Sequence, residues 1–299
     1  QLILRIRVLS HRKGIIRRVN KKTGVPSGWL NEVRSDGRVE GQAIPLGTPT
    51  ARYTHRQIVN VPAVYSQLGA ELRSLLTCSE DTKLVGTDAS GLEARVAGHF
   101  TTEFDGGAYA HELLEGDVHS KNAAIFSEAA GKEIDRDAAK TNYYALLYGA
   151  KARKIASQCG VSLGIGEYML ESFWDGNPTL DAVRVRVEEF AKKHGYIIGL
   201  DGRRIVIRSP HAAMNALFQS TGAILMKYAW AMAYDVANDD KWRCVCTQHD
   251  ETQALVKPEY IDEHVDLWPK AGEYVTNRFG MLVPIEFESK VGNNWKETH

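Results

Sequence analysis

The segment that most restricts the fold of this chain is RCVCTQHDETQALV, residues 243–256, in which a short polar turn separates two apolar stretches. Two such stretches around a tight turn are expected to pair as an antiparallel β-hairpin. Asp250 and Glu251 lie at its tip, and a second predicted strand, DTKLVGTDAS, ends on Asp88. Carboxylates beside apolar strands are electrostatically costly unless a positive group neutralises them. The sequence therefore predicts an antiparallel hairpin and a further strand, each with carboxylates at an end, and a positive partner for those carboxylates.

A divalent metal ion is the usual partner of such carboxylates. Oxygen ligands from Asp88 and Asp250 suit Mg²⁺, which commonly takes one or two carboxylates together with substrate phosphates. Two ions, about 3.5–4 Å apart, would activate an attacking oxygen and stabilise a leaving one. Aspartate is common in turns, so either position read by itself is more often structural.

A predicted helix, DRDAAKTNYYALLYGA at 135–150, carries two cations and then two phenols at steps of four: Arg136, Lys140, Tyr144 and Tyr148. Steps of four nearly follow one face of a helix, so these side chains form one stripe. Cations followed by flat polar aromatics suit a nucleoside triphosphate. The alternative is a surface helix with outward basic residues and half-buried tyrosines. Combined with the carboxylates, the stripe indicates phosphoryl transfer.

The rest of the chain reads as a mixture of helices and strands, which is typical of an α/β or α+β fold. Residues 107–189 are mainly helical with a break at 176–178, and residues 214–238 form a long apolar helix. Other predicted elements are a basic helix or arm at 1–22, hairpins at 28–44 and 195–209, a helix at 91–104, a helix from about 261 and a last strand at 283–289.

Charge and cysteine content bear on partners and compartment. The net charge is zero, but residues 1–56 contain 12 Lys and Arg against 3 acids. This bias is expected of a contact with a phosphate backbone, although a solvated basic arm would show it too. The 4 cysteines form no C-x-x-C motif and no ligand set with histidine, and we find no membrane span or signal peptide pattern. Free thiols in a reducing, intracellular compartment are therefore expected.

Several segments resemble the family A DNA polymerases, the DNA polymerase I type. GTDASGLEARVAGHF resembles their motif A, RDAAKTNYYALLYGA their motif B and QHDETQ their motif C. Further matches are TARYTHRQIVNVP, GDVHSKN, LDGRRIVIRSPHAAMNALFQSTGAILMK and VGNNWKETH. The likeness runs from about Gly41 to His299 and is strongest to the replicative polymerases of T-seven-like bacteriophages. It implies template-directed transfer of a deoxynucleotide to a primer 3′-hydroxyl.

The resemblance assigns a catalytic set, of which two aspartates bind metal. Asp88 and Asp250 fall on the two metal-binding aspartates, and Ala89 would add a backbone carbonyl. Glu251 lies beside them near the primer terminus in a secondary role. Lys140 would protonate the departing pyrophosphate.

The resemblance also implies residues that bind the incoming dNTP and the primer–template. Glu93 would crowd a ribose 2′-hydroxyl, Tyr144 would lie near the sugar 3′ position, and Tyr148 would stack beside the template base. The full dNTP set is Glu93, His119, Arg136, Lys140, Tyr144 and Tyr148. The primer–template set is Arg52, Asn215, Gln219 and His249, which would test pairing geometry in the minor groove.

Two positions depart from the family pattern. Ala51 stands where the family usually has a glycine before the arginine that falls at Arg52. We expect the alanine to stiffen the loop that contains Arg52. Gln248 stands where an aliphatic residue is usual, and the sequence offers no reason for a polar side chain there.

The implied architecture is a palm with an antiparallel sheet plus a helical fingers subdomain, with thumb and exonuclease largely absent. The expected boundaries are a basic arm or remnant of thumb with a hairpin at 1–40, palm at 41–106, fingers at 107–195 and palm at 196–299. The sequence given is then a fragment or a naturally split polymerase, with poor processivity. Expected partners are primer–template DNA, dNTPs and a separate polypeptide that supplies a thumb, an exonuclease or a processivity factor.

Alternative functions stay open at this stage. A non-catalytic or partner-dependent fragment would bind primer–template without metal-dependent turnover. A single-subunit RNA polymerase would share the palm, but Glu93 argues against it because a residue that excludes 2′-hydroxyls would be self-defeating. A metal-dependent nuclease would have no use for the triphosphate-binding helix. The expected context is phage DNA replication in the cytoplasm of a bacterial host.

Overall fold

The computed structural model describes residues 2–235 and 240–299. The chain divides into two compact units, each of which is described by itself. Unit 1 comprises Gln1–Ala89, Ala229–Ala271 and Glu286–His299, and unit 2 comprises Ser90–Tyr228 and Gly272–Ile285. The predicted fingers segment, 107–195, lies within unit 2, while the predicted subdomain boundaries stay predictions.

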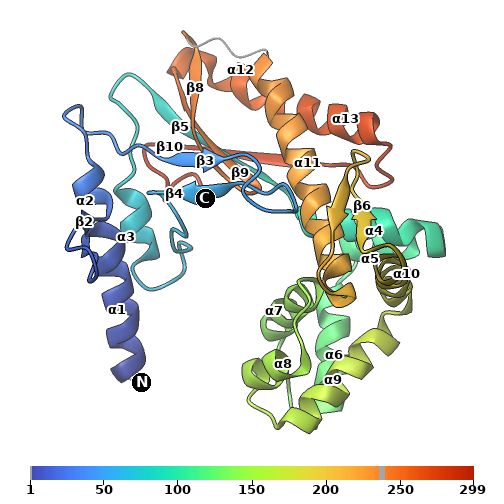
Figure 1. Cartoon of the computed structure of the whole chain (residues 1–299). Helices are drawn as coiled ribbons and strands as arrows, with labels where there is room; N and C mark the ends of the chain where they lie inside the picture. The colour runs from blue at the N-terminus through green and yellow to red at the C-terminus, as the bar shows by residue number, and fades with distance from the viewer. Residues whose placement is uncertain (1, 236–239) are drawn as a thin grey trace. The chain divides into compact units, whose positions relative to one another are not determined.

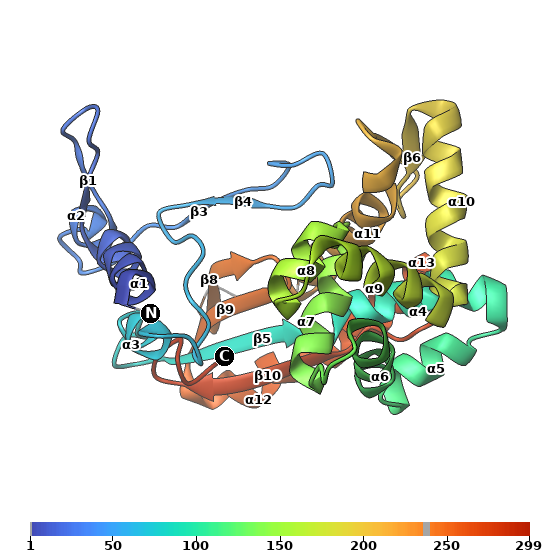
Figure 2. The ribbon, with the colours of Figure 1, turned by 90° about the horizontal axis from the view of Figure 1, so that it is seen from below.

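The centre of unit 1 is a four-stranded antiparallel sheet in the order β10-β5-β9-β8. The predicted acidic hairpin is confirmed as β8 and β9, and β10 pairs along the other side of β5 (Figures 1 and 2). The last strand begins four residues later than predicted. The strands are β5 (Lys83–Ala89), β8 (Trp242–Gln248), β9 (Glu251–Val256) and β10 (Phe287–Gly292).

Apolar side chains cover both faces of this sheet. Successive side chains of a strand point to opposite sides, so each strand can contribute to both layers. Val85, Ala254 and Val256 pack with Trp242 and Leu267 in one buried cluster. The alternating neighbours Leu84 and Leu255 pack in a second cluster that includes Ile58 and Trp295. Alternation along β5 and β9 therefore builds two apolar layers, one on each side of the sheet. The helical segments after β9 are η2 (Pro258–Tyr260), α12 (Ile261–Val265) and α13 (Leu267–Phe279).

The hairpin predicted at 28–44 is wrong in its first arm. Residues Trp29–Glu32 form a single helical turn, α2, and only a Val33–Val39 bridge remains of the expected pairing. Burial of Trp29 explains the difference: its indole N–H donates to the Gln57 carbonyl at 3.2 Å. The second arm pairs elsewhere, as β3 with β4. The other elements of this region are α1 (Leu2–Ile16), β1 (Arg18–Val19), β2 (Pro26–Ser27), β3 (Gln42–Ile44), β4 (Thr54–Arg56) and α3 (Gly69–Ser74).

Unit 2 is mainly helical, as predicted for 107–189, and its break lies between Gly176 and Pro178. Proline fits there because the first helical residue needs no backbone N–H donor. Helix α6 packs against α7 and α9 around the buried side chains of Phe126, Tyr143 and Phe173 (Figure 1). The helices are α4 (Leu92–Asp105), α5 (Ala108–Glu115), α6 (Val118–Ala130), α7 (Arg136–Leu147), α8 (Ala152–Cys159), α9 (Leu163–Gly176) and α10 (Pro178–His194).

The predicted hairpin at 195–209 and the long apolar helix follow α10. The hairpin is confirmed as β6 (Tyr196–Ile198) and β7 (Arg204–Val206), and η1 (Pro210–Ala212) leads into α11 (Ala213–Asp235). The last three residues predicted for the long helix, 236–238, lie outside the described residues. Across the described ranges, no helix is both long enough and apolar enough to cross a membrane.

Candidate functional site: carboxylates of unit 1 and a cationic helix of unit 2

The end of β5 lies against the β8–β9 turn, so the backbones of two predicted metal ligands, Asp88 and Asp250, are close together. Asp88 is the register partner of Glu251 on β9 and of Glu288 on β10. The next residue, Ala89, donates its N–H to the Asp250 carbonyl at 3.0 Å, which ties the turn to β5. The Asp88 side chain is exposed and that of Asp250 is half-buried. Both carboxylates therefore belong to the same end of the sheet.

The turn itself is tight and conformationally unusual. Only His249 and Asp250 separate β8 from β9, and His249 has a φ of 56°, in the left-handed region. A non-glycine residue there costs of order 1–3 kcal/mol, and such residues often occur at functional sites. The His249 ring meets His55 edge-on at 5.3 Å between centroids. Burial lowers the pKa of His55, although a hydrogen bond with the Thr247 backbone acts the other way. Sequence reasoning did not identify His55.

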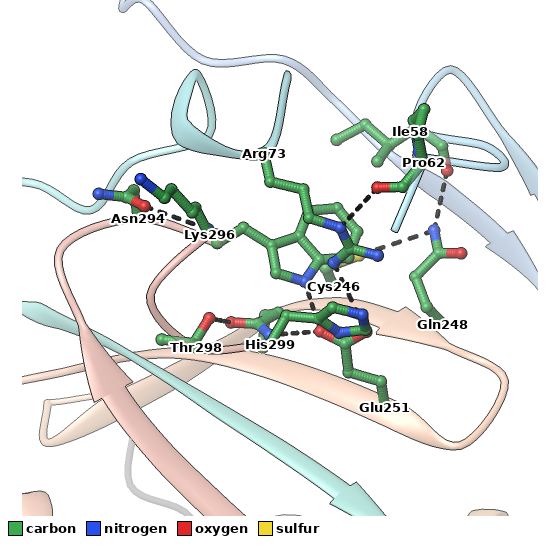
Figure 3. A network of polar contacts seen from close by, with 12 residues as sticks. Ile58, Pro62, Arg73, Cys246, Gln248, Glu251, Asn294, Lys296, Thr298 and His299 are labelled. Atoms are coloured by element: carbon green, nitrogen blue, oxygen red, sulfur yellow. Dashed lines mark hydrogen bonds and ion pairs between the residues drawn. The ribbon is translucent and has the colours of Figure 1, made fainter. Parts of the chain in front are cut away.

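Glu251 points into unit 1, where a buried polar network holds its carboxylate (Figure 3). Trp295 Nε1–H and Gln253 Nε2–H both donate to Oε1, the latter at 2.6 Å, and His299 Nδ1 lies 3.2 Å from Oε2. Burial alone would raise the pKa of Glu251, but the hydrogen bonds from His299, Trp295 and Gln253 outweigh it and lower the pKa. The carboxylate is therefore ionised at neutral pH.

The oxygen atoms at this end of the sheet could supply part of the ligand set of a divalent metal ion. Among the described residues, no group of three or more His, Cys, Asp or Glu side chains is arranged to hold a metal ion by itself. A self-contained zinc or calcium site is therefore not supported there, because those ions need more protein ligands. Mg²⁺ takes one or two carboxylates and completes its shell with water and phosphate. Asp88 and Asp250, with the Ala89 carbonyl, could serve as that partial ligand set.

In unit 2, α7 is built as the sequence predicts. The Asp135 side chain caps it by accepting from the Ala138 N–H at 2.7 Å, and Gly149, with a φ of 78°, follows its end. Arg136, in the first turn, donates from Nε to both Asp117 oxygens at 3.1 and 3.0 Å. Asp117 caps α6, so this ion pair joins the beginnings of two helices. The Arg136 hydrogen bond lowers the pKa of Asp117 well below its usual range.

His119, near the start of α6, lies beside these cations. Burial lowers its pKa first, and the positive charges of Lys140 and Arg136 lower it further. Its Nδ1 is buried and has no hydrogen-bond partner within the described residues. The structure thus brings His119, Arg136 and Lys140 together, as the three predicted phosphate contacts.

The aromatic end of the stripe meets the start of α4. Tyr148 donates its hydroxyl proton to Glu93 Oε1, and the Tyr144 ring lies 5.7 Å from that of His119. Burial raises the pKa of Tyr144, and the charge of Glu93 adds to this rise. Glu93, Tyr144 and Tyr148 therefore form one group that continues from the cationic group.

A buried tyrosine pair supports this group, and the sequence reading missed it. Tyr143 is fully buried, and its hydroxyl lies 3.2 Å from that of Tyr109 on α5. Its ring contacts both His119 and Tyr144, at centroid distances of 5.3 Å each. Burial raises the pKa of both tyrosines, so both stay protonated. The only sequence signal was the position of Tyr143 next to Tyr144.

The predicted primer–template residues fall in both units. Arg52 lies in the loop before β4 and His249 in the β8–β9 turn, both in unit 1. Asn215 and Gln219 lie one helical turn apart on α11, in unit 2. The roles of all four residues stay predictions.

The two departures from the family pattern acquire physical accounts. Ala51 is buried and has a φ of 60°, a conformation that favours glycine. Gln248, whose polarity was unexplained, donates from Nε2 to the Ile58 carbonyl at 2.9 Å. The amide thus ties β8 to the loop after β4.

Comparison with known proteins gives a consistent result. The DNA-directed DNA polymerases of Enterobacteria phage T3 and Escherichia phage T7 are each 31% identical over 95% of this chain and 44% of their own length. The POL domain of Pol1 from M. smegmatis, in a complex with DNA primer-template and dNTP, matches with a TM-score of 0.75 at 25% identity, over 90% of this chain and 50% of that one. The chain thus spans about half the length of these relatives. A model of DNA polymerase family A matches residues 8–297, and the chain therefore belongs to that family.

Proposed function

We propose that this chain carries the polymerising centre of a DNA-directed DNA polymerase, which adds deoxynucleotides to a primer 3′-hydroxyl on a DNA template. The observation that carries the proposal is the convergence in unit 2 of His119, Arg136 and Lys140 with Tyr144. Positive charges that already lower the pKa of a neighbouring histidine favour the binding of a polyanion. Membership of the family supports the same reaction.

The residues of unit 2 would hold and orient the dNTP. Arg136 and Lys140 would bind the triphosphate, and His119 would add a hydrogen bond from its imidazole. The primer 3′-hydroxyl would lose its proton to solvent and attack the α-phosphorus. The bond from that phosphorus to the oxygen bridging the β-phosphorus would break, and pyrophosphate would leave with a proton from Lys140. To bind the phosphates, Arg136 would have to break its ion pair with Asp117. That pair is exposed, and exposed ion pairs contribute little free energy, so the exchange would cost little.

Asp88, Ala89 and Asp250 would hold the magnesium ions. Two such ions supply an activated hydroxyl and stabilise the charge on the leaving group. The protein's own contribution is to fix both aspartates at one end of the sheet, through the β5–β9 register and the hydrogen bond from Ala89 to Asp250.

The choice of sugar would lie with Glu93. The hydrogen bond from Tyr148 holds its carboxylate in one orientation, beside Tyr144. A carboxylate fixed in this way would crowd a 2′-hydroxyl, which supports dNTP over rNTP as the substrate.

The proposed ligands are primer–template DNA and dNTP, which a related solved structure contains. Arg52, Asn215, Gln219 and His249 would contact the primer–template. Because the relatives at 31% identity are phage enzymes, we place the reaction in viral DNA replication inside a bacterial host cell. A separate polypeptide that supplies a thumb, an exonuclease or a processivity factor stays a prediction.

Extension of a labelled primer–template by this chain with Mg²⁺ and dNTPs tests the proposal. Extension that is lost in Asp250→Ala, and is absent with rNTPs, would support it. Tight primer–template binding without extension would refute it in favour of a non-catalytic binding fragment. Extension with rNTPs at the rate of dNTPs would indicate an RNA polymerase instead.

A further inference from the structure

Three of the four residues around the Glu251 carboxylate, namely Arg73, Trp295 and His299, lie far from it in the sequence. Trp295, which supplies one donor, comes from the C-terminal segment and is 2% exposed. Arg73, on α3, is 5% exposed and lies over the Trp295 ring at 4.6 Å from its centroid. A buried acid, a buried arginine and a buried indole thus form one cluster within unit 1 (Figure 3).

We propose that Trp295 and Arg73 are positioning residues: they fix Glu251, the first residue of β9, and so hold the Asp250 turn against β5. The inference rests on the proposed function, since it gives Asp250 its role as a metal ligand. In this proposal, Glu251 supports the turn that carries Asp250 and does not itself contact the substrate.

The hydrogen-bonding capacity of Glu251 supports this assignment. An ionised carboxylate offers about four acceptor sites. Oε1 accepts from Trp295 and Gln253, while Oε2 faces His299 at 3.2 Å and Arg73 Nη1 at 3.9 Å. The separation from Arg73 is too long for a hydrogen bond, so that contact is electrostatic. Little of the carboxylate is left for a metal ion or a primer.

The position of Glu251 is transmitted to Asp250 through the backbone. Glu251 pairs with Asp88 on β5 and with Gln248 on β8, so both neighbouring strands hold the backbone where the turn ends. The preceding residue, Asp250, accepts the Ala89 N–H. A shift of Glu251 would therefore change the distance between β5 and the turn that carries Asp250.

Two further contacts attach the C-terminal segment to the sheet. Thr298 donates from its hydroxyl to Gln253 Oε1 at 2.8 Å, which fixes the amide that binds Glu251. Gly86 on β5 leaves room for this: a Cβ at that position would lie 2.4 Å from the Thr298 carbonyl oxygen. Arg73 donates from Nε to the Pro62 carbonyl at 2.9 Å, which anchors its other side.

Trp295→Phe is the sharpest test, because it removes the N–H donor and keeps a ring beneath Arg73. Loss of a hydrogen bond to a charged group changes the equilibrium constant of the state that it stabilises by about tenfold or more. We therefore expect amide exchange at Ala89, measured by hydrogen–deuterium exchange, to accelerate by about tenfold. We also expect kcat of primer extension to fall by about tenfold while the KM for dNTP stays within about twofold.

Trp174→Phe is the matched control. Arg184 lies over the Trp174 ring at 4.9 Å, an equivalent arginine–tryptophan contact in unit 2. This variant should leave both the exchange at Ala89 and kcat unchanged. If it changes them as much as Trp295→Phe does, the effect is general destabilisation and the proposal is overturned.

The Glu251→Gln background shows whether Trp295 acts through Glu251. The proposal requires non-additive effects, so Trp295→Phe should lower kcat much less in Glu251→Gln than in the wild type. Equal losses in both backgrounds would refute it, as would a lowered melting temperature with no change in exchange at Ala89. If the wild type extends no primer, the proposed function fails, and exchange at Ala89 still decides the positioning role.

Discussion

Unit 1 buries the imidazole of a histidine among aromatic side chains, which gives a quantitative prediction for acid stability. His264 on α12 is 5% exposed, and its ring meets those of Trp242 and Trp268 at centroid distances of 5.5 and 6.4 Å. Its Nδ1 has no hydrogen-bond partner within the described part of the chain. Burial lowers the pKa of His264 from 6.5 to about 4.

The size and sign of the effect follow from this difference. A pKa lower by about 2.5 in the folded state corresponds to about 3.5 kcal/mol in full, at about 1.4 kcal/mol for each pKa unit, of which about 3 kcal/mol is reached at pH 4. His264 stays neutral in the folded protein, whereas the unfolded chain binds a proton below about pH 6.5. Unfolding is therefore favoured as the pH falls from about 6.5 to about 4, and the contribution vanishes above about pH 7.

Urea unfolding at pH 4 to 7.5, followed by tryptophan fluorescence, would measure this contribution in the wild type and in His264→Phe. Phenylalanine keeps an aromatic ring between the two tryptophans and removes the titration. The wild type should lose about 3 kcal/mol more than the variant between pH 7 and pH 4. His111→Gln, at an exposed histidine, controls for the loss of a histidine as such. Parallel curves for wild type and His264→Phe would refute the reasoning.

Substitutions at three further positions test other parts of the structure. Ala51→Val should lower the free energy of unfolding by about 2 kcal/mol or more in urea titrations, because a β-branched residue cannot adopt a φ of 60° without strain. Ala51→Gly should change the same free energy by less than about 1 kcal/mol. Tyr144→Phe should reduce dideoxynucleotide incorporation in competition assays, and unchanged incorporation would contradict the placing of its hydroxyl near the sugar 3′ position. Asp117→Asn keeps a helix cap but releases Arg136, so the KM for dNTP should fall a few-fold at low salt, and an unchanged KM would argue against the proposed exchange of partners.

Local patterns predicted those parts of the fold that depend on neighbouring residues. The acidic hairpin followed from two apolar stretches around a turn, and the stripe on α7 followed from its spacing of four. The failed arm at 28–44 shows the limit. Whether Trp29 joins a strand or a helical turn depends on the Gln57 carbonyl, 28 residues away, which receives its N–H.

The candidate site was predictable to different degrees for the same reason. Three members of the stripe lie on α7 and the fourth, Tyr148, is its C-cap, so all four could be named together. The supporting contacts could not be named from the sequence. In unit 2, Tyr143 meets Tyr109 across 34 residues, and in unit 1, Glu251 meets Trp295 across 44. Gln248 likewise had no visible reason until its partner was the Ile58 carbonyl, 190 residues away in sequence. Spacing identifies residues that share an element, and only the tertiary structure identifies what holds them.

The chemical roles of the two units differ in the sign of the charge that they concentrate. In unit 1, β5 and the β8–β9 turn present Asp88 and Asp250 at one end of a sheet, while the adjacent acid Glu251 is held by hydrogen bonds inside the unit. In unit 2, Arg136 and Lys140 lower the pKa of His119, which is the response expected of a group that faces excess positive charge. Considered within its own unit, the first group suits a metal cation, because carboxylate oxygens are the ligands that Mg²⁺ prefers. The second group suits anionic phosphate oxygens, because the positive charge concentrated there attracts a polyanion.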